Sequence, residues 1–288
     1  MLTIEAPAKV NLTLEVLEKR PDDFHEIRSI MQAVSLYDNL HFESSRGVSI
    51  KSGMPDWTAA ESLVSKAVSL LQQASGCSEG VSIEMEKRIP LLSGLGGDSS
   101  DAAAVLRGLN QLWELNLSRE NLLELAGQLG SDVSFFLYGG TALIEGRGEK
   151  VSPLPPLPRM WFVIALPPVP RLPGKTGQLY RSLKKNHYTD GQITDKMVEE
   201  IKAGRELSDS LLFNIFENVA FGRFSGLEAA REHFLKLGAP VVHLAGSGPA
   251  LYTMVEDKDR AEDLCLLLRK QRMEAFVAET LPAIEEIE

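Results

Sequence analysis

A glycine-rich loop between two regular segments constrains the fold of this 288-residue chain more than any other feature. The loop reads PLLSGLGGDSS over residues 90–100, and glycine holds three of the four positions 94–97. Apolar and polar residues alternate over 81–90, which predicts a strand before the loop, and a helical pattern from about 99 to 113 follows it. A strand that passes through glycines into a helix predicts a mixed α and β architecture.

Such a loop has a physical use as an anion-binding site. Glycines let backbone N–H groups point inward, and the helix that follows adds unpaired N–H groups and the positive end of its dipole. The hydroxyls of Ser99 and Ser100 could cap the helix, bind phosphate oxygens or hold Mg²⁺. The length of the loop and its two serines favour a polyphosphate site over the alternative, a tight turn with a serine cap.

Two common phosphate loops do not fit. A dinucleotide-binding fingerprint would need glycine at position 99, which is serine. A Walker A loop would need glycine five residues before the GKT of 174–176, where Val169 stands. The loop therefore belongs to another class of phosphate site.

Residues 2–16 form a second strong pattern, with apolar residues at every even position. A period of two predicts a strand, or a strand pair, with one buried face. Lys9, Asn11 and Thr13 would then project together from the other face, and Pro7 indicates a sheet edge or a break.

Charge and cysteine content limit the function classes. The net charge of −10 and pI near 5.2 argue against nucleic-acid or anionic-membrane partners, because both need basic surfaces. Two distant cysteines, Cys77 and Cys265, predict neither a disulfide framework nor a zinc site. Neither a signal-peptide pattern nor an apolar run of about 18 residues is apparent, so we expect a cytoplasmic protein.

Prolines mark the predicted domain junction. Eight of the 15 prolines fall in 153–173, on either side of the apolar strand 160–166. We therefore predict two domains, 1–152 and 153–288, each an α+β arrangement. The periodicity predicts these further elements: helices over about 58–74, 118–130, 209–222, 225–237 and 257–272, and strands over 28–36, 39–51, 240–244, 250–255 and 273–279.

The glycine loop resembles the second motif of the GHMP kinases, whose usual form is P-x-x-x-G-L-G-G-G-S-S-x-A-A. Further motifs appear in the same order as in one branch of that superfamily: APAKVNLTLEV at 6–16, RPDDFHEI at 20–27, LGSDVSFF at 129–136, KTGQLY at 175–180 and AGSGPALY at 245–252. The resemblance implies a two-domain GHMP kinase fold, with an N-terminal domain like domain 2 of ribosomal protein S5 and a ferredoxin-like C-terminal domain. That branch phosphorylates the 2-hydroxyl of a cytidine-diphosphate-linked methylerythritol in non-mevalonate isoprenoid synthesis.

The resemblance also implies the reactants and partners. ATP is the expected phosphoryl donor and Mg²⁺ the expected metal, with Ser100 as its implied protein ligand. A small cytidine-diphosphate substrate is the expected acceptor, with neither nucleic acid nor membrane as a partner. The expected assembly is a monomer or a weak homodimer.

Two residues carry the implied catalytic roles. Asp132 resembles the aspartate that accepts the proton of the substrate hydroxyl, and Lys9 resembles its cationic partner. From the residues alone, Asp132 could merely cap the next turn and Lys9 could be a solvated lysine.

The remaining implied residues bind the two substrates. Those for the acceptor are Asn11, Phe24, His25 and Thr176, with Phe24 stacking on the cytosine and His25 reading its polar edge. Those for ATP are Pro90, Leu91, Leu92, Ser93, Gly94, Leu95, Gly96, Gly97, Asp98, Ser99, Ser100, Gly246, Ser247 and Gly248. The last three form a turn that would support the loop, with a plain hairpin turn as the alternative.

Three departures from the family pattern stand out. Asp98 replaces the last glycine of the usual loop, Asp23-Phe24-His25 replaces G-Y-H, and Ser134 replaces a proline. Asp98 could point outward, help hold a cation or weaken nucleotide binding. The alternatives are therefore another GHMP kinase, of the homoserine or mevalonate type, and a nucleotide-binding relative without catalysis.

Overall fold

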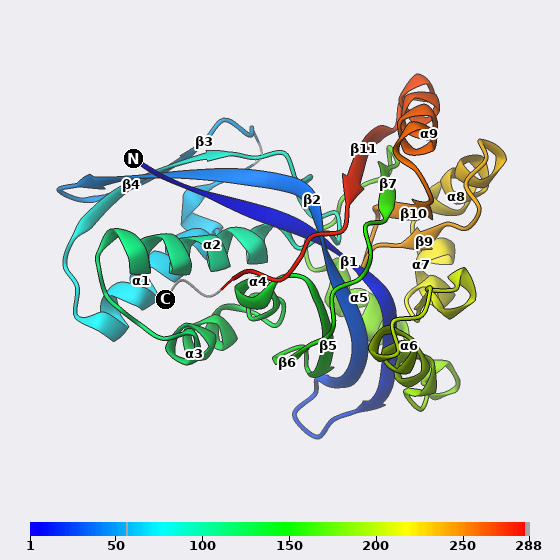
Figure 1. Cartoon of the computed structure of the whole chain (residues 1–288), viewed down its shortest axis with the longest axis horizontal. Helices are drawn as coiled ribbons and strands as arrows, with labels where there is room; N and C mark the ends of the chain where they lie inside the picture. The colour runs from blue at the N-terminus through cyan, green and yellow to red at the C-terminus, as the bar shows by residue number, and fades with distance from the viewer. Residues whose placement is uncertain (56, 286–288) are drawn as a thin grey trace. The chain divides into compact units, whose positions relative to one another are not determined.

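The computed structural model describes residues 1–55 and 57–285 (Figure 1). Its strands are β1 Leu2–Lys19, β2 His25–Ser45, β3 Val48–Ser52, β4 Gly80–Glu86, β5 Thr141–Gly146, β6 Lys150–Pro153, β7 Trp161–Leu166, β8 Phe213–Asn214, β9 His243–Leu244, β10 Leu251–Val255 and β11 Glu274–Glu279. Its α-helices are α1 Leu63–Ser75, α2 Gly97–Leu112, α3 Arg119–Leu129, α4 Phe135–Tyr138, α5 Lys175–Ser182, α6 Gln192–Lys202, α7 Glu217–Arg223, α8 Leu227–Lys236 and α9 Lys258–Lys270.

The chain forms two compact units that are not consecutive stretches of sequence. Unit 1 comprises Met1–Ala8, Leu36–Pro90 and Gly96–Tyr138, and unit 2 comprises Lys9–Ser35, Leu91–Leu95 and Gly139–Glu288. Strands β1 and β2 and the glycine loop thus contribute residues to both units. The predicted family-domain boundary between residues 152 and 153 stays a prediction, because these units group residues by packing and not by family domain.

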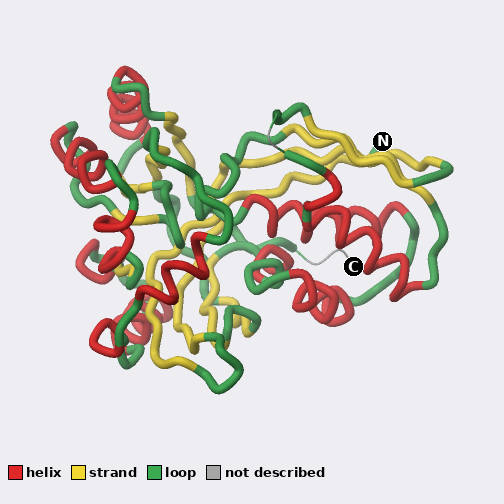
Figure 2. The backbone as a smooth tube through the Cα atoms, turned by 180° about the vertical axis from the view of Figure 1, so that it is seen from behind, coloured by secondary structure: helices red, strands yellow, loops and turns green. Residues whose placement is uncertain are grey.

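Unit 1 packs helices on one face of a sheet. Strand β4 pairs antiparallel with β2 and parallel with β3. Figure 1 and the reverse view in Figure 2 both show the strands on one side and α1, α2 and α3 on the other. The contact is close: a Cβ at Gly108 of α2 would lie 2.8 Å from the Phe42 ring of β2. The sheet therefore positions α2, the helix that follows the glycine loop.

In the first sheet of unit 2, strand β1 is buried on both faces. Strand β2 pairs with β5, β5 with β6, and β1 runs parallel to β8 at Thr13–Leu14. All residues from Ala6 to Val16 are buried, so the prediction of one buried face was wrong. The polar members are held by hydrogen bonds: buried Glu15 accepts one from the backbone N–H of Thr194 in the first turn of α6, at 2.8 Å. Strand β1 also continues through Pro7 without a break.

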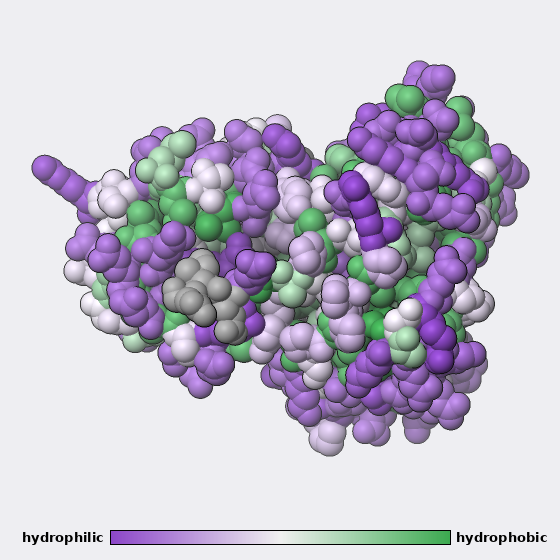
Figure 3. Space-filling model, viewed as in Figure 1, coloured by the Kyte–Doolittle hydropathy of each residue, from purple (hydrophilic) through white to green (hydrophobic). Residues whose placement is uncertain are grey.

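A second sheet of unit 2 has the order β11-β7-β10-β9 and is antiparallel throughout. The predicted apolar strand is its member β7, and helix α9 packs on β7 and β11. Figure 3 shows hydrophilic side chains gathered over the β1–β2 turn of this unit. No helix in the described part of the chain is long and apolar enough to cross a membrane.

Periodicity located most elements but misplaced some. The predicted helix over 209–222 is a short 3₁₀ turn, strand β8 and then α7. Strand β8 has only two residues, too few for a period of two to reveal. The predicted strands over 28–36 and 39–51 are one long strand, β2, followed by β3. Helices α5 and α6 were not predicted, because proline and polar residues obscure their patterns.

Candidate functional site

Lys9 of β1 is a buried lysine in a polar network. Its side chain is 3% exposed, and Nζ donates to Oδ1 of Asn11 at 2.7 Å. Nδ2 of Asn11 donates in turn to Oγ of Ser29 at 2.9 Å. The backbone N–H of Lys9 donates to the carbonyl of Leu95 in the glycine loop, at 2.9 Å. Strand β1 therefore presents Lys9 and Asn11 next to the part of the loop that belongs to unit 2.

The turn between β9 and β10 lies against the same network. Asn214 donates from Nδ2 to the carbonyls of Leu244 and Gly246, both at 2.8 Å, and so fixes the turn. Gly246 has φ +52°, and a Cβ there would lie 3.1 Å from Nζ of Lys9 and 3.3 Å from Oδ1 of Asn11. Because Gly246 has no side chain, the backbone of the turn can lie close to the ammonium of Lys9.

The same turn supports the glycine loop. Ala250 donates its N–H to the carbonyl of Ser93 at 3.1 Å. Gly94, at φ +92°, leaves no room for a side chain: a Cβ would lie 2.1 Å from the carbonyl oxygen of Ala245 and 2.8 Å from the nitrogen of Gly248. Gly94 thus serves backbone packing between loop and turn.

This packing predicts a specific cost for Gly94→Ala. The variant combines a positive φ with a steric clash against backbone, so we expect it to lower the free energy of unfolding by about 2–4 kcal/mol. Urea denaturation measures the change. The matched control is Gly222→Ala in α7, where nothing lies within 4 Å, and this change should be neutral or slightly stabilising. Equal effects at both glycines would contradict the described loop.

Lys175, Thr176 and Ser247 form a second polar group in unit 2. Lys175 is 5% exposed and donates from Nζ to Oγ of Ser247 at 2.9 Å, while the hydroxyls of Thr176 and Ser247 share a hydrogen bond at 2.8 Å. Burial, with the charge of Lys9 acting in the same direction, lowers the pKa of Lys175 to about 8. The site therefore contains two buried lysines within electrostatic range of each other.

The N-terminus of α2, in unit 1, has the features of an anion site. Gly96 is its N-cap with φ +78°, and Ser100 is the first residue whose N–H is satisfied within the helix, by the carbonyl of Gly96 at 2.9 Å. Oγ of Ser100 is buried and has no hydrogen-bond partner among the described atoms. The first amides of a helix have no partner within it, so together with the hydroxyl of Ser100 they suit a phosphate or a phosphate-bound cation.

Beneath this helix start lies a buried ion cluster. Nζ of Lys87 contacts Oδ2 of Asp38 at 2.7 Å and Oδ2 of Asp101 at 2.5 Å, and all three side chains are fully buried. Burial opposes the charged form of Lys87, but the two carboxylates outweigh it and raise its pKa. Burial also raises the pKa of Asp101, although the Lys87 ammonium opposes this shift. The cluster joins β2, the segment after β4 and α2.

Asp98 lies at the edge of this cluster. Its side chain is 48% exposed, and Oδ1 lies 3.7 Å from Nζ of Lys87. The carboxylate that replaces the usual glycine is thus ion-paired to Lys87 and half open to solvent. It also lies in the first turn of α2, where the helix dipole favours an acid.

Comparison with known proteins identifies the family. Residues 62–140 match the model of the GHMP kinase N-terminal domain, and residues 197–272 match that of the GHMP kinase C-terminal domain. The chain is 50% identical over 285 residues to the 4-diphosphocytidyl-2-C-methyl-D-erythritol kinase of Dehalococcoides mccartyi, covering 99% of this chain and 100% of that one. The chain belongs to the 4-diphosphocytidyl-2-C-methyl-D-erythritol kinase family of GHMP kinases.

Solved structures agree with this assignment. A crystal structure of a 4-(cytidine 5′-diphospho)-2C-methyl-D-erythritol kinase matches with a TM-score of 0.83 and 34% identity, over 97% of this chain and 99% of that one. The homoserine kinase of Cytophaga hutchinsonii matches with a TM-score of 0.72 and 21% identity, over 98% and 95%. The second match is evidence for the fold alone. The predicted α+β GHMP kinase fold and the predicted family are confirmed.

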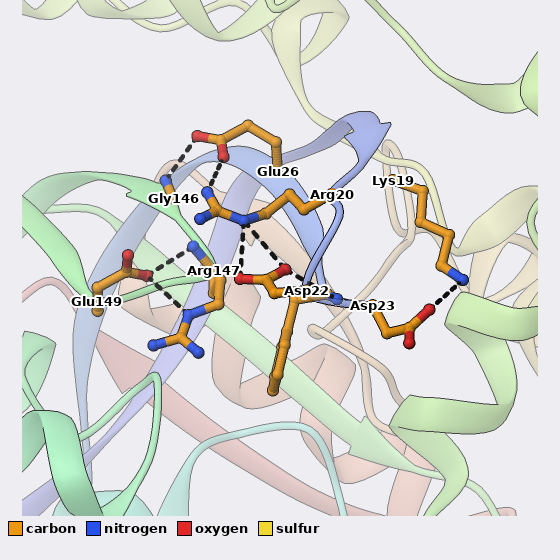
Figure 4. A network of polar contacts seen from close by, with 9 residues as sticks. Lys19, Arg20, Asp22, Asp23, Glu26, Gly146, Arg147 and Glu149 are labelled. Carbon is orange, nitrogen blue, oxygen red and sulfur yellow. Dashed lines mark hydrogen bonds and ion pairs between the residues drawn. The ribbon is translucent and has the colours of Figure 1, made fainter.

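The β1–β2 turn holds the residues that the family resemblance assigns to the cytosine. Phe24 is 52% exposed, and the Arg147 guanidinium lies 4.8 Å from the centre of its ring. Figure 4 shows the polar contacts around this turn: Arg20 binds Asp22 and Glu26. Glu26 also accepts the N–H of Gly146 at 3.2 Å, which ties the turn to the end of β5. The turn thus presents an exposed aromatic ring on a braced backbone.

His25 lies at the start of β2 and stacks on an aromatic ring. Its imidazole is 4.8 Å from the ring of Tyr180, with 18° between the planes. Burial, and to a smaller extent the charge of Lys19, lowers the pKa of His25. A neutral imidazole has one donor and one acceptor nitrogen, which suits the reading of a base edge.

The predicted catalytic pairing of Lys9 with Asp132 stays a prediction. Lys9 belongs to unit 2, whereas Asp132 belongs to unit 1 and lies, partly exposed, in the turn between α3 and α4. Within unit 2, the predicted residues Lys9, Asn11, Gly94 and Gly246 contact one another. The roles assigned to all predicted site residues likewise stay predictions.

Sequence reasoning missed three candidate residues. Lys175 precedes the predicted Thr176, and its proximity to a threonine in a motif was the available signal. Tyr180 ends the same KTGQLY motif and would have been found by asking which aromatic residue accompanies His25. Lys87 gave no signal, because its partner Asp38 is 49 residues away.

Proposed function

We propose that this protein transfers the γ-phosphoryl group of ATP to the 2-hydroxyl of 4-diphosphocytidyl-2-C-methyl-D-erythritol, a step of non-mevalonate isoprenoid synthesis. One observation carries the proposal: the 50% identity to a kinase of that name extends over 99% of this chain. A match of this length includes the loop, the turn and both lysine-bearing segments, and not a single motif. The protein would act on these two small molecules as a cytoplasmic monomer or weak homodimer.

The glycine loop and α2 would hold the phosphates of ATP. The first amides of α2 lack partners within the helix, and the helix dipole adds positive potential there. When bound, Mg²⁺ neutralises charge on the β- and γ-phosphate oxygens. Ser100, whose buried hydroxyl has no described partner, and Asp98, whose carboxylate is half exposed, would hold Mg²⁺ together with phosphate oxygens.

Asp132 and Lys9 would act on the acceptor hydroxyl. In this role Asp132 accepts the hydroxyl proton as the oxygen attacks phosphorus. The ammonium of Lys9 lowers the pKa of the hydroxyl and stabilises the negative charge that develops in transfer. Asn11, already hydrogen-bonded to Lys9, positions that ammonium and binds the acceptor.

The diphosphocytidyl end of the acceptor would bind at unit 2. Phe24 offers an exposed ring for stacking, and His25 offers a neutral imidazole for the polar edge of the cytosine. The hydroxyl of Thr176 lies beside Lys175 and Ser247 and would line the same site. This arrangement predicts selection for a cytidine-bearing acceptor.

A substrate panel tests the proposal. ADP formation is measured by coupled assay with 4-diphosphocytidyl-2-C-methyl-D-erythritol, homoserine and mevalonate as acceptors. We expect kcat/KM for the cytidine acceptor to exceed the others at least 10³-fold, because the other two leave the base and diphosphate contacts unmade. A preference for either small acceptor would assign another GHMP kinase activity. ATP binding without transfer to any of the three would indicate a non-catalytic relative.

A further inference from the structure

Lys175 is a buried cation for which the described part of the chain supplies no acidic partner. Its side chain is 5% exposed, and among the residues that the structure describes no Asp or Glu forms an ion pair with it. Its described partner is the hydroxyl of Ser247, a neutral group. An ammonium has three donors, so this single hydrogen bond leaves Lys175 incompletely satisfied.

The surroundings make this burial more costly. The charged group that acts on Lys175 is Lys9 of β1, which carries the same sign. On its own helix, Lys175 is the first residue of α5, where the positive end of the dipole also disfavours a cation, and Arg181 lies six residues further on. Buried charges in proteins are normally paired with an opposite charge, and no such pair is described for Lys175. Selection for folding stability alone would therefore not favour a lysine here.

Ser247 connects this lysine to the rest of the site. It lies in the turn between β9 and β10, one residue after Gly246, whose Cβ position is 3.1 Å from Nζ of Lys9. Through Ser247, Lys175 therefore shares a turn with the Lys9 network. Two ammonium groups directed at one short turn form a local positive field in a chain of net charge −10.

We propose that Lys175 is a substrate-contacting residue that binds a phosphoryl oxygen, as the second cation beside Lys9. The ligand is an organic diphosphate or triphosphate, supplied either by the cytidine-diphosphate acceptor or by ATP. An anion between the two lysines would satisfy the free donors of Lys175 and offset its repulsion from Lys9. The assignment deepens the proposed function, and it rests on that function for the identity of the ligand.

The alternative is a structural lysine that anchors α5 to the turn through Ser247. The two roles differ in the stability of the ligand-free protein. A structural anchor would make Lys175→Met less stable than the wild type. A binding lysine, buried at a cost, would make Lys175→Met as stable as the wild type or more so.

The pH dependence of stability gives a second distinction. The pKa of Lys175 in the folded protein, about 8, lies below its ordinary value of 10.5, so the unfolded chain binds the extra proton in this interval. The free energy of unfolding of ligand-free protein should therefore rise as the pH rises from 8 toward 10.5. Lys175→Met should lack this contribution.

Calorimetric titration at pH 8 tests the proposal on the full chain. The probes are cytidine 5′-diphosphate and a non-hydrolysable ATP analogue, each titrated in two buffers of different ionisation enthalpy so that proton uptake is measured. At least one probe should bind the wild type with uptake of about 0.3–0.5 proton. Lys175 is about half neutral at pH 8, and a bound anion would favour its charged form. Lys175→Met should abolish the uptake and weaken that probe at least tenfold, whereas Lys185→Met, at an exposed lysine, should leave both unchanged.

The arms separate the possible outcomes. If Lys175→Met loses affinity and proton uptake for cytidine 5′-diphosphate alone, Lys175 binds the acceptor. If it loses them for the ATP analogue alone, Lys175 binds the donor. Wild-type affinity and proton uptake for both probes in Lys175→Met would overturn the proposal. A lowered melting temperature of that variant with unchanged proton uptake would also overturn it, in favour of the structural anchor. Neither titration measures turnover, so a failed substrate panel would leave this result interpretable.

Discussion

Asp132→Asn should reduce kcat for phosphoryl transfer about 10³-fold, within the range of about 10²–10⁴ that a positioned general base contributes. The amide keeps the size of the side chain but cannot accept the hydroxyl proton at neutral pH. The KM for ATP should change less than about threefold, because the loop and α2, rather than Asp132, hold the nucleotide in our proposal. Steady-state and single-turnover rates with the cytidine acceptor measure both effects.

The matched control for this variant is Glu124→Gln, an exposed carboxylate of α3 in the same unit. It removes the same charge from unit 1 and should leave kcat unchanged. If Asp132→Asn retains kcat within about tenfold of the wild type, Asp132 is not the general base. Its turn between α3 and α4 would then have a structural role, as capping alone would predict.

Lys87→Met should lower the free energy of unfolding by about 3–5 kcal/mol, the cost of breaking a buried ion pair from one side. The variant leaves the carboxylates of Asp38 and Asp101, both fully buried, without their common cation. Asp38 would keep its hydrogen bond from the Ile89 amide, at 2.7 Å, but Asp101 would lose its described cation. Urea denaturation at pH 7 measures the loss.

A mutant cycle shows whether the cluster is the cause. Asp101→Asn removes one of the two carboxylates, so the double variant Lys87→Met/Asp101→Asn should recover at least about 1 kcal/mol relative to strict additivity. The exposed lysine Lys236, paired with Glu232 at 3.9 Å, is the control, and Lys236→Met should change stability by less than about 1 kcal/mol. Strictly additive effects at Lys87 and Asp101 would show that the two side chains do not interact.

The local elements were predictable where a single period dominated. Alternation identified β1 and β4, and the apolar run between prolines identified β7, because each pattern lies within one strand. Ser118 was expected to begin α3, and it does so through a capping box with Asn121. The burial of both faces of β1 was not predictable from alternation, since it depends on which distant segments cover the polar face.

The candidate site was predictable only in part, for the same reason. The motif pattern pointed to Lys9, Asn11 and Gly246, which the structure brings together. The position of Lys175 beside Thr176 was a signal in the sequence, but its contact with Ser247, which is 72 residues away, was not predictable from local pattern. The reason for glycine at position 94 is likewise a distant backbone carbonyl, that of Ala245. Local sequence patterns indicate whether a segment is a helix or a strand. Contacts between residues so far apart in the sequence depend on the tertiary fold.

Phosphorus NMR of the reaction product tests the central claim most directly. The acceptor hydroxyl at C2 lies on a carbon that carries a methyl group and no hydrogen, so phosphate placed there shows no three-bond coupling to a proton. Incubation of the protein with ATP, Mg²⁺ and 4-diphosphocytidyl-2-C-methyl-D-erythritol should yield ADP and one new phosphomonoester singlet in equal amounts, with the diphosphate resonances retained. A new doublet or triplet, from transfer to a secondary or primary hydroxyl, or ADP without a new monoester, would contradict the account.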